Sequence, residues 1–562
     1  MKELLIINLK RNGDIFASGH IIRSFIAKYP EIKISLLVLK EFEKAALNLK
    51  GITEVHTIDR KKILTYKKNK IFSDGFALDE FQRDIGKVTG KTWDAVYNLS
   101  NDRVSTHLTS LLKTKSSKHI GIRFNETCNI EYSSEWAIVM NDILTSVKYA
   151  PVTFTDTYLN MANLKPANES FVLKTKEEYN KSSATNFAEL RKVENNGNDV
   201  KLIGIQLTAS TDYKSLSKEQ LINLIDALYM SPNFFPILLA APTEQERNLV
   251  SIINSEFNNS LVSVEADFLA LNSVLMNLDL LITPDTAIKH LADLTNTPTI
   301  EISLGESPLF KQGSLNQESF IVTPTVSKRV FSKKTVENDM SLQAQNILLS
   351  TEDIVALAKN ILFAEDLSNH KFAQGISVYS VNNDELGTRY ELAYGAVDQN
   401  AEIERLISRQ LLLKKFTGSE DLEIYNALVI DGTTQLESWL TDTKLAITEV
   451  SKNLLGTLRS LLQVDGSKAK TGQFLKNLTE LLAECEVESQ FMAIPLLRFR
   501  ARVEALNTSN LLESAREMES LIYELKADIQ VQVDIVKTAS DFVRRTKDSQ
   551  RTKFSKENQY DI

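Results

Sequence analysis

Short apolar runs alternate with segments of helical spacing along the first 124 residues. Ile15–Tyr29 has apolar residues three and four positions apart, and Pro30 ends the predicted helix. Further helices are expected at Phe42–Leu49 and Val104–Leu112. The apolar runs have the length of buried strands, and they lie at Leu4–Leu9, Ile32–Leu39, Val55–Ile58, Trp93–Leu99 and His119–Phe124. This alternation predicts a doubly wound parallel sheet.

A second block repeats the alternation after the polar segment Arg191–Asp199. Its predicted strands are Leu202–Leu207, Phe235–Ala240, Leu261–Val264, Leu278–Thr283 and Thr299–Ser303. Its predicted helices are Lys218–Met230, Glu244–Asn254, Phe268–Leu275, Thr286–Leu294 and, last, Thr351–Leu362. The sequence therefore predicts an α/β protein with two Rossmann-like domains, at residues 1–175 and 176–365.

The pattern changes beyond residue 365. Ile376–Val381 alternates like a lone strand, and later apolar residues follow amphipathic helical spacing, as in Leu511–Leu525. Pro495 and Asn507–Asn510 are expected to break these helices. We predict a mainly helical region of unknown role at 366–543 and a polar, basic, disordered tail at 544–562.

Composition narrows the class of protein. The chain has 562 residues, 43% of them hydrophobic and 25% charged, as in soluble globular proteins. A net charge of −8 argues against bulk attraction to nucleic acid. The two cysteines lie far apart in the sequence, which indicates a reducing cytoplasm. The sequence contains no run of about 18 apolar residues, so we expect no membrane span.

Gly13 and Asp14 follow the first predicted strand, at the sheet edge where open α/β sheets bind ligands. Glycine allows a tight turn and a close backbone approach. Asp14 is a candidate catalytic carboxylate, but a helix N-cap is the favoured interpretation of this motif alone. The two roles are compatible.

A second motif, Asp285-Thr286-Ala287-Ile288-Lys289-His290, follows another buried strand and opens a helix. The free N–H groups of a helix N-terminus suit a diphosphate, and Thr286 adds a hydroxyl donor. A capped helix with a core histidine is the alternative. No second His or Cys stands at metal-binding spacing, so we predict no metal site.

Three weaker features complete the candidates. Ser210 and Lys214 lie in a hydroxyl-rich segment after a strand and can contact phosphate, although a polar surface loop is equally compatible. Glu244, after Pro242, can hold ribose hydroxyls or favour the helix dipole. Arg60, Lys61 and Lys62 form a basic run, for which a solvated surface is the favoured interpretation.

The order and spacing of these motifs over about residues 1–360 resemble the bacterial heptosyltransferases of glycosyltransferase family 9. The Gly-Asp turn within Leu4–Tyr29 matches, and residues 285–290 match the family's Asp-Thr-Gly-x-x-His signature. Two departures are Ala287, which would not meet a positive-φ requirement, and residues 15–20, which are expected to alter acceptor fit.

The resemblance implies a GT-B fold, with two Rossmann-like domains facing across a cleft, and an inverting, metal-independent sugar transfer without a cofactor. Asp14 is then the general base. The donor is a nucleotide-diphospho-sugar, with ADP-heptose as one candidate. Donor contacts are expected from Gly13, Ser210, Lys214, Glu244, Asp285, Thr286, Ala287 and His290, and weak acceptor contacts from Arg60, Lys61 and Lys62.

Other interpretations stay open at this stage. The chain can be an inactive nucleotide-sugar-binding module whose helical half serves as a docking surface, or an epimerase on the same scaffold. A dehydrogenase is disfavoured because no G-x-G-x-x-G follows the first strand. The acceptor class is a glycan, a lipid-linked sugar or a protein. We expect a bacterial cytoplasmic enzyme, with peripheral inner-membrane contact and oligomerisation through the C-terminal helices as options.

Overall fold

The computed structural model describes residues 1–69, 71, 73–167, 173–194, 200–211, 214–304, 309–324, 349–395, 397–486, 489–507 and 511–557. It divides into two compact units. Unit 1 contains residues 1–123, 153–384 and 388–397, and unit 2 contains residues 124–152, 385–387 and 398–562. The segment Arg191–Asp199 was expected to be a boundary loop, but Arg191–Glu194 are helical, and residues 195–199 lie outside the described residues, as do residues 558–562 of the expected tail.

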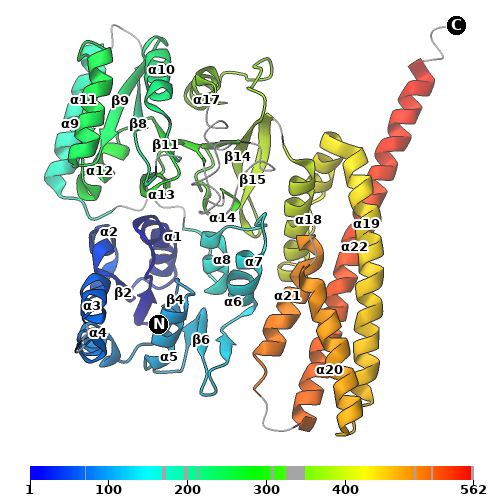
Figure 1. Cartoon of the computed structure of the whole chain (residues 1–562). Coiled ribbons are helices and arrows are strands. Elements are labelled where there is room, and N and C mark those ends of the chain that lie inside the picture. The colour runs from blue at the N-terminus through cyan, green and yellow to red at the C-terminus, as the bar shows by residue number, and fades with distance from the viewer. Residues whose placement is uncertain are drawn as a thin grey trace. The chain divides into compact units, whose positions relative to one another are not determined.

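Unit 1 begins with a parallel five-stranded sheet in the order β3-β2-β1-β4-β5, which we call the N-terminal lobe together with its helices (Figure 1). Its strands are β1 Glu3–Ile7, β2 Lys33–Leu39, β3 Ile52–Ile58, β4 Ala95–Asn98 and β5 His119–Ile120. The helices are α1 Asn12–Lys28, α2 Glu43–Asn48, α3 Arg60–Lys67, α4 Ser73–Thr89, α5 Arg103–Leu111 and α8 Phe154–Met161, with a 3-10 turn at Lys40–Phe42. The predicted helices and four of the predicted strands of this block are confirmed, whereas His119–Phe124 is divided at Gly121, which has a positive φ, into β5 and the strand β6 Ile122–Phe124 of another sheet.

The C-terminal lobe of unit 1 is built on eight strands in the order β10-β9-β8-β11-β12-β13-β14-β15. Its strands are β8 Lys201–Gln206, β9 Phe234–Ala240, β10 Val262–Glu265, β11 Leu280–Pro284, β12 Thr299–Ile302, β13 Phe320–Pro324, β14 Ile376–Asp384 and β15 Gly387–Gly395. Its helices are α9 Glu177–Glu194, α10 Lys218–Tyr229, α11 Glu244–Glu256, α12 Phe268–Leu275, α13 Ala287–Thr295, α14 Leu309–Gln312 and α17 Thr351–Phe363. Two Rossmann-like lobes in one chain confirm the predicted fold class.

Strands β14 and β15 correct one prediction. Ile376–Val381 is not a lone strand, because β14 pairs antiparallel with β13 and carries β15 on its other side. Apolar side chains of β14, such as Ile376 and Val378, are fully buried in the core of the C-terminal lobe. The α/β unit therefore extends about thirty residues past the predicted boundary at 365.

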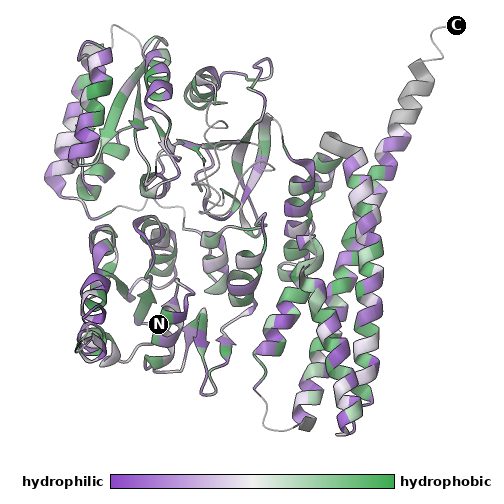
Figure 2. Cartoon of the chain, viewed as in Figure 1, coloured by the Kyte–Doolittle hydropathy of each residue, from purple (hydrophilic) through white to green (hydrophobic). Residues whose placement is uncertain are grey.

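Both sheets are buried because their strands are almost entirely apolar, as the green strands of Figure 2 show. In the N-terminal lobe Leu5, Ile7 and Val96 are fully buried together with Trp93, whose indole N–H donates to the Val88 carbonyl at 3.1 Å. Fully burying one such aliphatic side chain contributes roughly 1.5–3 kcal/mol. These cores fix the strand ends on which the site is built.

Helices α1 and α13 pack directly against each other and join the two lobes of unit 1. Gly19 permits this contact, because a Cβ there would lie 2.8 Å from the Cδ1 of Leu294. In the segment of residues 15–20, which departs from the family pattern, Ile15, Phe16 and His20 are buried. Ala17 and Ser18 line a recess together with Asp14, so the expected effect on acceptor fit stays a prediction.

Unit 2 contains long helices and an insertion from the N-terminal part of the chain. The insertion holds β7 Ile130–Tyr132, paired with β6 Ile122–Phe124, then α6 Glu135–Ile138, a π-helical turn Val139–Ile143 and α7 Leu144–Ser146. The later helices are α18 Gln399–Phe416, α19 Leu422–Leu462, α20 Lys468–Ala483, α21 Gln490–Glu504 and α22 Leu511–Glu557, with a 3-10 turn at Glu484–Glu486. Residues 124–152 therefore do not belong to the predicted 1–175 domain.

Salt bridges tie the insertion to the helices of unit 2. The Arg502 guanidinium lies 3.0 Å from Glu135 and 2.8 Å from Glu524, and Arg498 pairs with Glu135 and, at 2.8 Å, with Asp528. Glu135 lies on α6, whereas the other four residues lie on α21 and α22. This tertiary network had no signal in the local hydrophobic pattern.

Two further predictions for unit 2 were wrong. The tail expected to be disordered from residue 544 continues α22 as far as Glu557. Pro495, expected to break a helix, lies inside α21. Proline removes the N–H that would bind the Phe491 carbonyl, and the buried Gln532 side chain donates to that carbonyl at 2.5 Å instead. Among the described residues, no helix is both long and apolar enough to cross a membrane.

Candidate active site

The site forms where the strand order of each lobe reverses. In the N-terminal lobe, β1 lies between β2 and β4, and in the C-terminal lobe β8 lies between β9 and β11. Chain connections leave in opposite directions at these points, so the carboxyl ends of the strands open a crevice. Asp14 follows β1, Lys214 follows β8 and Asp285 follows β11. Residues far apart in sequence thus meet within unit 1.

A cleft of about 930 Å³ lies between these strand ends. Nine of the twelve predicted site residues line it: Gly13, Asp14, Arg60, Ser210, Lys214, Asp285, Thr286, Ala287 and His290. Its volume falls within the roughly 300–1,000 Å³ of small-molecule sites. The cleft draws on both lobes, which confirms the predicted arrangement of two domains facing across a cleft.

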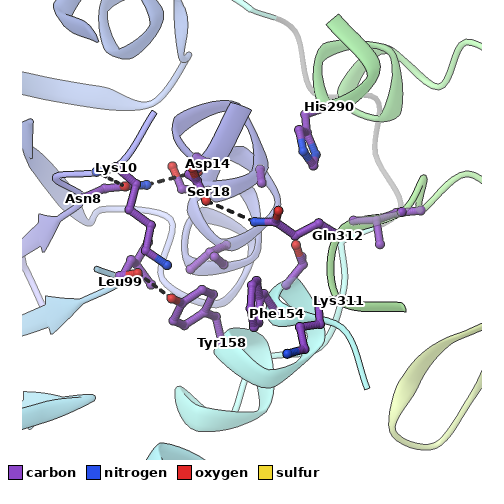
Figure 3. Close-up of a pocket in the computed structure, with 15 residues that line it drawn as sticks. Asn8, Lys10, Asp14, Ser18, Leu99, Phe154, Tyr158, His290, Lys311 and Gln312 are labelled. Atoms are coloured by element: carbon purple, nitrogen blue, oxygen red, sulfur yellow. Dashed lines mark hydrogen bonds between the residues drawn. The ribbon is translucent and has the colours of Figure 1, made fainter. Parts of the chain in front are cut away.

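Asp14 is held through both of its carboxylate oxygens. It is the third residue of α1, whose N-cap is Arg11, so it is not the N-cap itself. Its Oδ2 accepts the Arg11 N–H at 3.2 Å, and its Oδ1 accepts from Nε2 of Gln312 at 3.2 Å (Figure 3). The carboxylate therefore has a capping role and also faces the cleft, as the two compatible interpretations allowed.

Helix α13 presents its N-terminus to the same cleft. Thr286 is the N-cap, and its hydroxyl accepts the Ile288 N–H at 3.3 Å while donating to Gln206 at 2.7 Å. Ala287 is the first residue of the helix and is not among the residues with positive φ. Alanine in place of the family glycine is therefore not strained here, and backbone N–H groups of the helix N-terminus other than that of Ile288 can bind an anion.

A lysine and an aspartate stand beside that helix N-terminus. The Nζ of Lys214 lies 3.8 Å from Oδ2 of Asp285, and both side chains are only 11% exposed. Thr211, in the same segment as Lys214, has a buried hydroxyl oxygen with no hydrogen-bond partner among the residues that the structure describes. Ser210 is exposed at the rim of the cleft. A cation, a hydroxyl and helix N–H groups together can receive a diphosphate.

The imidazole of His290 is buried beside Lys289. Burial lowers its pKa to about 3, and the charge of Lys289 acts in the same direction. The ring lies against α1, because a Cβ on Gly13 would be only 3.0 Å from its Cδ2. A neutral imidazole supplies one donor and one acceptor without adding charge. The glycine is needed for this close approach.

Several site residues were missed by the sequence analysis. Lys10 lines the cleft and a smaller recess of about 30 Å³ beneath Asp14, which Tyr158 and Lys311 also line (Figure 3). Burial disfavours the charge of Lys10, but Tyr158 and Asp14 outweigh it and raise its pKa. The sequence did offer a signal for Lys10, since it is a polar residue between the first strand and the Gly13-Asp14 turn. Gln206, at the end of buried β8, carried a similar signal.

Three predicted residues do not line the cleft. Lys62 lies 2.7 Å from Glu80 and Lys61 is exposed, whereas Arg60 lines the cleft and donates to Glu41 at 2.5 Å. Glu244 is exposed at the start of α11. The neighbouring Glu246 turns inward instead, and its Oε1 accepts the Thr208 hydroxyl at 2.8 Å. The rotation of α11 about its own axis, which the motif did not determine, decides which of the two glutamates faces inward.

No group of three or more metal-binding side chains occurs in the part of the chain that the structure describes. Asp14 and Asp285 line the cleft with a single histidine, His290, and two lysines, Lys10 and Lys214. These side chains suit an anionic ligand better than a cation.

Residues 85–339 match the model of glycosyltransferase family 9 (heptosyltransferase). Similar solved structures include the family 9 glycosyl transferase of Veillonella parvula DSM 2008, at 14% identity over 65% of this chain and 98% of that one, with a TM-score of 0.44. E. coli heptosyltransferase WaaC with ADP is 13% identical over 62% and 100%, with a TM-score of 0.41. E. coli ADP-heptose lps heptosyltransferase II is 13% identical over 65% and 99%, with a TM-score of 0.42. No curated protein matches the sequence. Residues 85–339, less than half of the chain, thus match glycosyltransferase family 9, and this match supports a glycosyltransferase.

Proposed function

We propose that the protein transfers a heptose from a nucleotide-diphospho-sugar to an acceptor hydroxyl, with inversion and without a metal or other cofactor. The observation that carries the proposal is the placement of Asp14 across one cleft from Lys214 and the N-terminus of α13. The family description supports heptose as the sugar. ADP-heptose is the first donor to test.

In the proposed reaction Asp14 takes the proton of the acceptor hydroxyl as that oxygen attacks the anomeric carbon. The bond between the anomeric carbon and the diphosphate oxygen breaks, and its electron pair leaves with the nucleoside diphosphate. Lys214 and the N–H groups that follow Thr286 stabilise the charge on the leaving diphosphate. Gly13 keeps the base close to α13, where the reacting atoms must meet.

The alternative of an inactive binding module gains no support from the site. A base, a buried lysine and an open helix N-terminus all line the same cleft. The carboxylate of Asp14 lines this cleft in addition to its capping role, and donor binding alone gives that position no use.

Calorimetry with ADP and ADP-heptose, in buffer containing a chelator, tests donor binding. We expect Lys214→Ala to weaken binding by about 10- to 100-fold, because a charge-assisted contact to phosphate is worth roughly 1.5–3 kcal/mol. Lys218→Ala is the matched control, since Lys218 is an exposed lysine of α10 that pairs with Glu256 at 3.4 Å.

Turnover is then measured as ADP release from ADP-heptose with lipid-linked sugars, free glycans and protein as acceptors. Wild-type affinity in Lys214→Ala, or full turnover in Asp14→Asn, would contradict the assigned roles. A strict requirement for a divalent ion would exclude the metal-independent mechanism.

A further inference from the structure

Gln312, which no motif singled out, makes the one side-chain hydrogen bond to the carboxylate of Asp14 within the described residues. Its Nε2 donates to Oδ1 at 3.2 Å, while the Arg11 N–H occupies Oδ2. Figure 3 shows the amide reaching from the C-terminal lobe to α1. The remaining lone pairs of Asp14 are left to accept a proton from a substrate hydroxyl.

Three buried ionisable side chains hold the backbone from Gln312 to Leu315, and we call them the buried clamp: Lys289, Asp293 and Glu301. The Nζ of Lys289 donates to the Gln312 carbonyl. The Ser314 N–H donates to Glu301 at 2.8 Å. Asp293 accepts the Ser314 hydroxyl at 2.6 Å and the Leu315 N–H at 3.0 Å.

Burying the three ionisable side chains of the buried clamp costs free energy, so their charges must be paired with one another or with hydrogen-bonding groups. Lys289 is 0% exposed, Glu301 1% and Asp293 3%. Burial disfavours the charge of Lys289, but Glu301, Asp285 and Asp293 outweigh it and raise its pKa. Lys289, held by these partners, fixes the Gln312 carbonyl. The backbone at Gln312 therefore cannot rotate freely, and its side-chain amide stays directed at Asp14.

The clamp also reaches the proposed diphosphate site. The Nζ of Lys289 lies 3.6 Å from Oδ1 of Asp285, and the other oxygen of Asp285 lies 3.8 Å from Lys214. One series of contacts thus runs from Lys214 through Asp285 and Lys289 to Gln312, and from its amide to Asp14.

We propose that Gln312 is a positioning residue that orients the carboxylate of Asp14 for proton transfer, and that Lys289 fixes Gln312 in this role. The inference rests on the proposed function of Asp14. A base must be held within about 0.5 Å of its productive position, so losing one of its two restraints lowers the rate of the chemical step. Donor binding uses other groups and is left intact.

The test compares Gln312→Ala with wild type in steady-state ADP release from ADP-heptose, with the best acceptor from the screen above. We expect kcat to fall about 10- to 100-fold while the donor KM changes less than about 2-fold. Gln245→Ala, on the exposed face of α11, is the matched control. Gln312 is half-buried, so the variant is expected to fold, which its thermal unfolding midpoint checks.

Gln312→Glu separates positioning from packing, because the side chain keeps its size. The introduced carboxylate faces that of Asp14, and two facing carboxylates repel each other unless they share a proton. We expect this variant to be slower than Gln312→Ala at neutral pH and to recover relative to it as the pH falls. A pH-independent ratio between the two variants would overturn the positioning role.

The outcomes separate the two proposals. If Asp14→Asn is inactive and Gln312→Ala keeps the wild-type kcat, the inference fails and the base assignment survives. If Asp14→Asn keeps the wild-type kcat, the base assignment fails and the inference fails with it. Lys289→Met tests the clamp: in a folded variant, adding Gln312→Ala should cause no further loss of kcat, and full additivity would overturn the role of Lys289.

Discussion

Gly13→Ala should separate catalysis from stability. The added methyl carbon would lie 3.0 Å from Cδ2 of His290 and 3.6 Å from the Cα of Ala287. Carbon atoms prefer separations of about 3.5–4.0 Å, so α1 and α13 must move apart by about 0.5 Å. The imidazole is buried at 8% exposure and cannot turn into solvent without leaving the cleft wall.

The magnitudes follow from opposing terms. Overpacking of this kind costs about 1–3 kcal/mol. Replacing glycine by alanine in a helix returns up to about 1 kcal/mol, since Gly13 is a helical residue without a positive φ. The net loss of stability is therefore at most about 3 kcal/mol, and at most about 2 kcal/mol if the full helix gain is returned. The same 0.5 Å shift separates Asp14 from the diphosphate site and should lower kcat/KM by about 10-fold or more.

The assay pairs ADP release from ADP-heptose with the thermal unfolding midpoint. Gly86→Ala is the matched control, because Gly86 lies inside α4 and a methyl group there meets nothing within 4 Å. That control should keep full activity and gain up to about 1 kcal/mol. Wild-type kcat/KM in Gly13→Ala would refute the claim that the close approach of α1 to α13 is needed for catalysis.

Two predictions concern stability. Burial raises the pKa of Glu301 to about 7, so between its ordinary value and 7 the folded state holds a proton that the unfolded chain has released. The free energy of unfolding should therefore fall by up to about 3 kcal/mol as the pH rises through this range. Urea unfolding at a series of pH values measures this dependence, and Glu301→Gln should remove it. The same dependence on pH in wild type and variant would contradict the assignment to Glu301. Gln532→Leu should leave the Phe491 carbonyl without its donor and cost about 1–3 kcal/mol, measured by thermal unfolding against exposed Gln530→Leu; equal midpoints would show that Pro495 needs no compensation.

Local pattern determined the α/β part of the chain. The strands of both lobes are near-continuous apolar runs, and turns or helix caps such as Ser217 follow them, so each element was readable without its neighbours. The Gly13-Asp14 turn and the Asp285–His290 motif were predicted to serve a site for the same reason. Each follows directly from a strand end, where the fold itself directs ligands.

The local sequence pattern gave wrong predictions where a residue or strand contacts a partner that is distant in sequence. Pro495 was expected to end a helix, but Gln532 of α22 satisfies the carbonyl that proline leaves free. Ile376–Val381 was expected to stand alone, although it pairs with β13 more than fifty residues earlier in the chain and has β15, directly after it, on its other side. No local window contains both Pro495 and Gln532, or both β13 and β14.

Within the site, the sequence by itself determined which segments would meet, and tertiary structure decided which side chains take part. Glu244 and Glu246 are two positions apart on one helix, and only the packing of α11 turns Glu246 inward. Gln312 reaches Asp14 because Lys289 binds its backbone across 23 residues of chain. A motif fixes the chemistry of its own strand end, whereas contacts between lobes depend on packing that no single segment encodes.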